Sequence, residues 1–131
     1  MWQLQSTYSI AMQNISRILP PTIRATQEIS EAMDFAEVIL LTVSAQATRS
    51  VLQQMRPFVK KDTIIVLCAK GIELSSGKML SEVAQEEVPE ATTAILSGPG
   101  FATDIAQNKL ISVTIACKKE GIAARLAQML G

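Results

Sequence analysis

The sequence contains no histidine. Its absence removes the side chain that most often serves as a general base near neutral pH and as a zinc ligand. Only two cysteines are present, Cys68 and Cys117, and each of them ends an apolar run. We interpret both as buried free thiols in a reducing compartment, with a disulfide between them as the minor alternative. We expect no metal site.

Aromatic residues make up only 4% of the chain, so stacking platforms for single-stranded bases are not expected. Lysine plus arginine equals aspartate plus glutamate at 12 each, which argues against a basic face for nucleic acid. The N-terminus lacks a basic segment followed by an apolar block, and the longest apolar run, 38–43, is far too short to span a membrane. The composition therefore predicts a cytoplasmic protein, with 131 residues suited to one domain.

Four continuous apolar runs, without in/out alternation, predict strands that are covered on both faces. They cover 37–43, 63–69, 92–97 and 111–117. Helical periodicity occupies the intervening and flanking segments, at about 3–16, 28–34, 46–56, 78–87, 100–107 and from 122 onward. This alternation predicts an α/β fold with a parallel sheet and right-handed crossovers. A doubly wound sheet opens with a strand, whereas this chain opens with a helix, so we expect the later part of a larger domain.

Two glycine-containing segments resemble phosphate-binding loops without matching them. The stretch "SGPGFAT" has Thr103 where the dinucleotide fingerprint requires glycine or alanine, so we interpret it as a tight turn onto a helix N-terminus. The stretch "GIELSSGKM" has five residues between its glycines, where a P-loop needs four. We expect Ser75 or Ser76 to be a helix N-cap. Nearly all of six carboxylates are interpreted as a solvated surface, the six being Glu28, Glu31, Asp34, Glu37, Glu86 and Glu87.

Lys70 directly follows the predicted strand 63–69. In open α/β sheets, ligands bind in the crevice outside the carboxyl ends of the strands. A lysine there is a cation for a phosphate or a donor that polarises a carbonyl; the alternative is a side chain that only reaches into solvent. The segment 44–46 and Gly98 end neighbouring strands, so we expect them to line the same crevice.

Three blocks, "LTVSAQATRSVL", "CAKGIELSSGKMLSEVAQEEVPE" and "AILSGPGFATDIA", resemble the NAD(P)-dependent glycerol-3-phosphate dehydrogenases of bacterial type. The resemblance implies a Rossmann-like parallel sheet with helices on both faces, of which residues 1–131 would form a partial NAD(P)-binding domain. It also implies hydride transfer between NAD(P)H and the pair dihydroxyacetone phosphate and sn-glycerol 3-phosphate, in the synthesis of glycerophospholipid precursors. The sequence does not distinguish NAD from NADP, because that choice is made at a strand absent from it.

The resemblance implies roles for particular residues. Lys70 would contact both the phosphate-bearing substrate and the cofactor. Gly98 would bind the substrate through its backbone, and Ala102 would touch the cofactor. Ser44 and Gln46 occupy the family's cofactor-side turn, and we expect both to contact the cofactor.

The sequence also departs from the family pattern. Gly100 stands at the position of a substrate-binding hydroxyl residue, so that hydroxyl is lost. The family's first strand and glycine-rich loop would lie before Met1, and its proton-transfer lysine belongs to a helical C-terminal domain that is absent here. We therefore expect the isolated chain to be incomplete and inactive, and to associate with a second copy or a complementary chain through the edge of 37–43. The alternative is an inactive α/β remnant or interaction module of the family.

Overall fold

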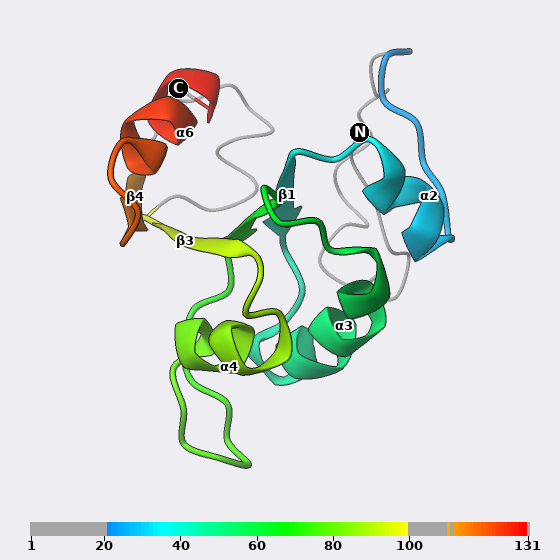
Figure 1. The fold of residues 1–131 in the computed structure, drawn as a ribbon. Helices are drawn as coiled ribbons and strands as arrows, with labels where there is room; N and C mark the ends of the chain where they lie inside the picture. Colours follow the sequence, from blue (N-terminus) through cyan, green and yellow to red (C-terminus); the bar gives the residue numbers. More distant parts are fainter. Residues whose placement is uncertain (1–20, 100–109, 111, 131) are drawn as a thin grey trace, which may run out of the picture.

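The computed structural model describes residues 21–99, 110 and 112–130 (Figure 1). Within them a single sheet has the strand order β1-β2-β3-β4. The strands are β1 (Val38–Leu41), β2 (Ile64–Leu67), β3 (Thr92–Ser97) and β4 (Thr114–Cys117). The helices are α2 (Ile29–Asp34), α3 (Thr48–Met55), α4 (Leu80–Glu87) and α6 (Ile122–Leu130), with 3-10 turns η1 (Ala45–Ala47) and η2 (Arg56–Phe58). The helices predicted over 3–16 and 100–107 lie outside the described residues.

The first three strands are parallel, as predicted, with Val38 opposite Ile64 and Ile64 opposite Thr92. The fourth strand differs, because β4 runs antiparallel to β3, with Ala94 opposite Cys117. An antiparallel strand begins at the sheet edge where its neighbour ended, so no crossover to the opposite edge is needed. An apolar run carries no information on direction, which is why the prediction of a wholly parallel sheet was wrong for β4.

The sheet carries a hydrophobic cluster on each face. Alternate side chains of β2 point to opposite faces, so Ile65 and Leu67 join one cluster while Ile64 and Val66 join the other. The first cluster includes buried residues of α2, α3 and α4, and the second is completed by Leu126 of α6. Figure 1 shows α3 and α4 side by side and α6 next to β4. The predicted helices on both faces are therefore confirmed.

The outermost strand β4 is less buried than its apolar sequence suggests. Its residues alternate between exposed and half-buried, whereas every residue of β2 is buried. Among the described elements, α6 packs on β4, and this explains burial of one face. The prediction that 111–117 is covered on both faces is therefore wrong for β4.

Both cysteines are free, as predicted, although they are half-buried instead of buried. They lie beside the cluster on the α6 side of the sheet. The Cys68 thiol lies 3.5 Å from the carbonyl oxygen of Val66, and the Cys117 thiol lies 3.4 Å from that of Thr93. Burial raises the pKa of the Cys68 thiol, which disfavours the reactive thiolate.

Candidate functional site

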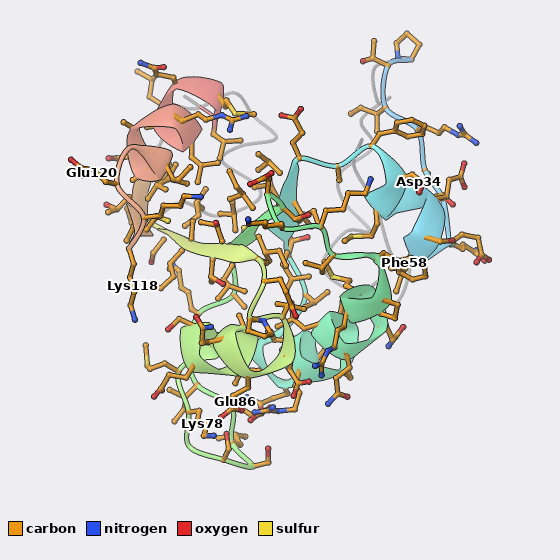
Figure 2. The ribbon with its side chains drawn as sticks, in the orientation of Figure 1. Asp34, Phe58, Lys78, Glu86, Lys118 and Glu120 are labelled. Atoms are coloured by element: carbon orange, nitrogen blue, oxygen red, sulfur yellow. The ribbon has the colours of Figure 1, made fainter. Side chains whose placement is uncertain are left out.

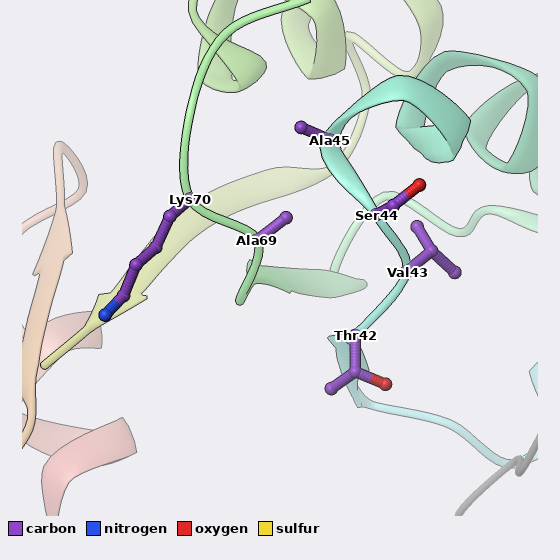
Figure 3. A pocket seen from close by; sticks show the side chains of 6 residues that line it. All are labelled: Thr42, Val43, Ser44, Ala45, Ala69 and Lys70. Atoms are coloured by element: carbon purple, nitrogen blue, oxygen red, sulfur yellow. The ribbon is translucent and has the colours of Figure 1, made fainter. Parts of the chain in front are cut away.

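A hollow of about 450 Å³ opens at the carboxyl ends of β1 and β2. One wall is the segment that leads from β1 to η1, and the other is the segment that follows β2 (Figure 3). Its lining residues are Thr42, Val43, Ser44, Ala45, Ala69 and Lys70. Parallel strands send their outgoing loops to the same edge of the sheet, so residues far apart in the sequence meet here. The structure thus brings Ser44 and Lys70 to one hollow.

Lys70 connects this hollow to the end of the third strand. Its Nζ donates a hydrogen bond of 2.6 Å to the carbonyl oxygen of Gly98, and the side chain is otherwise exposed. Figure 3 shows the side chain extending from the β2 segment toward the end of β3. An ammonium group carries three N–H donors, so the bond to Gly98 leaves it able to donate to a ligand oxygen as well.

Gly98 lies where the backbone of β3 approaches the start of β4. A Cβ atom placed on Gly98 would lie 2.6 Å from the carbonyl oxygen of Ser112 and 3.2 Å from Cα of Val113. Only glycine fits such an approach without moving the backbone. The close packing therefore fixes the carbonyl group that accepts from Lys70.

The other predicted site residues are placed differently. The Gln46 side chain is not part of the hollow's lining. Instead, its Nε2 donates to the carbonyl oxygen of Ile72 at 2.9 Å and its Oε1 accepts from the backbone N–H of Leu74 at 3.0 Å. Gly100 and Ala102 lie outside the described residues, so their roles stay predictions.

A charged cluster that joins α3, the loop 71–79 and α4 was missed by the sequence analysis. Arg49, in the first turn of α3, forms a two-pronged ion pair with the buried Glu73, with Nε–Oε1 at 2.8 Å and Nη2–Oε2 at 2.9 Å. The same guanidinium contacts Glu86 and Glu87 of α4. Lys78 pairs with Glu86, and Figure 2 shows these two side chains together below α4.

Two sequence-based expectations are corrected by this cluster. Glu87 is buried against Arg49 and is not part of a solvated surface. Ser76 does not cap a helix: its hydroxyl donates to Glu73, and α4 has Met79 as its N-cap. Ser75 is likewise too early in the chain to cap a helix that begins at Leu80. The sequence held one signal that Glu73 belongs near the site: it lies three residues after Lys70, within the stretch that resembles the family.

The cluster shifts the titration of its members. Hydrogen bonds from Arg49 and Ser76 lower the pKa of Glu73 from 4.5 to about 2. The pKa of Glu86 is also lowered, first by its hydrogen bond from Lys78 and then by that from Arg49. The three carboxylates together raise the pKa of Arg49. Each ionised group is therefore stabilised by the folded arrangement.

The lowered pKa of Glu73 predicts a specific loss of stability in acid. Because the folded pKa is below the unfolded one, Glu73 contributes stability that is complete above pH 4.5 and is lost as the pH falls toward about 2. We expect the urea midpoint of the wild type to fall more steeply than that of Glu73→Gln between those pH values. Midpoints measured by circular dichroism that run parallel for the two proteins would contradict this.

Within the residues that the structure describes, two other classes of site are not found. None of the described helices has the length and hydropathy of a membrane span. No group of three or more cysteines and carboxylates is arranged to hold a metal ion.

Comparison with known proteins shows which family this chain is similar to. Residues 9–123 match the family model described as the NAD-dependent glycerol-3-phosphate dehydrogenase N-terminus. The chain is 41% identical over 113 residues to glycerol-3-phosphate dehydrogenase [NAD(P)+] of Parvibaculum lavamentivorans, covering 86% of this chain and 34% of that protein. It is 42% identical over 113 residues to the protein of the same name from Rhodospirillum rubrum, covering 86% of this chain and 32% of that protein. The chain therefore spans about one third of the length of these curated relatives.

A solved structure shares the fold as well. The crystal structure of glycerol-3-phosphate dehydrogenase from Coxiella burnetii aligns with a TM-score of 0.79 and 28% sequence identity. The alignment covers 86% of this chain and 34% of that one. The α/β arrangement and the sequence thus agree on one family.

Proposed function

The chain belongs to the NAD-dependent glycerol-3-phosphate dehydrogenase family, and we propose that it forms part of the dinucleotide-binding domain of such an enzyme. The proposed reaction is hydride transfer between NAD(P)H and the pair dihydroxyacetone phosphate and sn-glycerol 3-phosphate. The observation that carries the proposal is the placement of Lys70, a cation held against Gly98 at the rim of a hollow beyond two parallel strands.

The residues of the hollow suit a nicotinamide cofactor. Val43, Ala45 and Ala69 offer small apolar surfaces to a flat ring, and Ser44 offers an exposed hydroxyl. Lys70 adds a positive charge beside them, which suits a phosphate or carbonyl oxygen. Bound NAD(P)H would supply the hydride, which is chemistry that protein side chains do not provide.

The chain's own residues would bind and polarise the substrate. We assign to Lys70 a hydrogen bond to the reacting oxygen or the phosphate of the substrate, where a cation stabilises developing negative charge. Gly98 holds the lysine through its carbonyl oxygen and would present its backbone to the substrate. Gly100 and Ala102 are assigned, through the family resemblance, to the substrate and cofactor sides respectively. The proton for the new hydroxyl group would come from the family's second lysine, outside this chain.

A chimera tests the proposal. In it, this chain replaces the matching third of the Rhodospirillum rubrum relative, and NADH oxidation is followed after addition of dihydroxyacetone phosphate. We expect turnover by the chimera and none by the 131-residue chain alone. A chimera that folds, as judged by circular dichroism, yet binds no NADH in calorimetry would overturn the proposal.

The predicted association through 37–43 stays a prediction. In the described sheet β1 lies at one end and pairs with β2. A protein with an accessible strand edge can pair with another chain, which is the interaction-module alternative considered for this sequence. Analytical ultracentrifugation of the isolated chain tests this. Sedimentation as a monomer at the concentrations of the binding assays would argue against self-association.

A further inference from the structure

We propose that Gln46 and Arg49 form a clamp that joins the two walls of the hollow and thereby positions Lys70. Gln46 lies in η1 and Arg49 in α3, directly after the wall that follows β1, and both bind the loop 71–79 that directly follows Lys70. The role assigned to Lys70 rests on the proposed function. The clamp itself concerns only how the loop 71–79 is held, so it can be tested separately from the reaction.

The first half of the clamp is the Gln46 amide. Both ends of this amide are engaged by one short stretch of backbone, because it donates to Ile72 and accepts from Leu74. This pattern of one donor and one acceptor on alternate residues imitates the pairing of two strands. Gln46 thereby fixes the backbone two to four residues after Lys70. We therefore assign it as a positioning residue, in contrast to the cofactor contact expected from the sequence.

The second half is the ion pair between Arg49 and Glu73. Arg49 is half-buried and Glu73 is only 5% exposed, so the pair is shielded from water more than a surface salt bridge is. The planar guanidinium meets both carboxylate oxygens, which restricts orientation as well as distance. Its further contacts with Glu86 and Glu87 anchor the same group to α4.

The loop needs such polar ties because its apolar side chains do not hold it. Ile72, Leu74 and Met79 are 43%, 78% and 53% exposed. Glu73 is the buried side chain between Lys70 and Leu80. The loop is held by hydrogen bonds within itself, from the Glu73 amide to Lys78 and from the Gly77 amide to Glu73, and by its contacts with Gln46 and Arg49. Loss of the clamp should therefore free the segment that carries Lys70 while leaving both hydrophobic clusters in place.

The test compares Arg49→Met with Arg49→Lys in the 131-residue chain and in the chimera. Two readouts are taken: amide hydrogen exchange over 70–77 in the free chain, and kcat and KM of the chimera. For Arg49→Met we expect exchange of the Glu73, Leu74 and Gly77 amides to accelerate at least 10-fold and kcat/KM to fall at least 10-fold. Arg49→Lys keeps the positive charge, but an ammonium group cannot contact both carboxylate oxygens of Glu73 as the planar guanidinium does. We therefore expect both effects to be smaller for Arg49→Lys than for Arg49→Met.

Arg125→Met is the matched control, because Arg125 also binds a glutamate, Glu37, but lies on α6. It should leave both readouts within twofold of the wild type. Unchanged exchange over 70–77 in Arg49→Met would overturn the clamp. Accelerated exchange with unchanged kcat and KM would also overturn it, because the pair would then be merely structural. If the wild-type chimera binds no NADH, the proposed function fails, and the clamp is then decided by exchange of the Glu73, Leu74 and Gly77 amides alone.

Discussion

Replacing Lys70 by methionine is expected to lower kcat/KM of the chimera for dihydroxyacetone phosphate by about 100- to 1000-fold. Methionine keeps the length of the side chain but removes the charge and every donor. Because Lys70 is exposed and donates to a single carbonyl in the described structure, its removal should cost little stability. The effect should therefore fall on the reaction and not on the fold. Steady-state kinetics and thermal unfolding of the same preparation separate the two.

Lys60→Met provides a control for this experiment. Lys60 is also exposed and donates from Nζ to a backbone carbonyl, that of Asp34, at 2.8 Å. It lies away from the hollow, so its replacement should leave kcat/KM within twofold of the wild type. A Lys70→Met loss of less than about threefold, equivalent to roughly 0.7 kcal/mol, would remove Lys70 from the mechanism.

Gly98→Ala should have the largest effect on stability among the changes considered. The added Cβ atom would meet the carbonyl oxygen of Ser112 at 2.6 Å, and backbone must move to make room. Overpacking of this kind destabilises a protein by about 1–3 kcal/mol, and we expect the upper half of that range because the neighbour is backbone. The movement would also shift the carbonyl oxygen that Lys70 binds. We therefore expect the chimera to lose activity even well below its unfolding temperature.

Gly121→Ala distinguishes crowding from backbone strain. Gly121 has φ of 79°, yet nothing lies within 4 Å of the position that its Cβ would take. Its replacement should cost about 1–2 kcal/mol for the left-handed conformation and leave the hollow unchanged. Urea unfolding measures both free energies, and calorimetry with NADH measures the site. Equal NADH affinities for Gly98→Ala and wild type would show that the position of this carbonyl does not matter.

The parts of the fold that follow from local patterns could be predicted from the sequence. Residues 64–69 of the predicted strand are all apolar, and β2 is indeed buried on both faces within it. The direction of β4 could not be predicted in this way. Direction is decided by the path of the connection between strands, and most of the connection between β3 and β4 lies outside the described residues; what the structure shows is the start of β4 packed against Gly98. The sequence around Gly98 does not indicate which backbone segment this glycine will pack against.

In the candidate site, too, the features that depend on chain position could be predicted and those that depend on long-range contacts could not. Lys70 could be located because the end of a parallel strand marks the ligand-binding edge of the sheet. Gln46 was expected to line the crevice because it follows a strand, but chain position does not reveal which way a side chain points, and its amide binds Ile72 and Leu74 instead. Arg49 and Glu73 are 24 residues apart, and nothing local in either segment indicates that they pair. Long-range polar contacts are the part of a site that a single sequence discloses least.

The two hydrophobic clusters also bear on how the molecule comes apart. Among the described residues, one face of the sheet is joined to three helices, whereas the other is joined to α6 through Leu126. The described contact of α6 with this cluster rests on the fully buried Leu126 and the half-buried Ile122. Proteins open in cooperative units whose free energies differ, and units with few buried apolar contacts open first. The hollow is built on the segments after β1 and β2, tied together by residues of η1 and α3. We therefore expect thermal fluctuations to detach α6 while the hollow stays assembled, so that opening of α6 and global unfolding would be separate events in this domain.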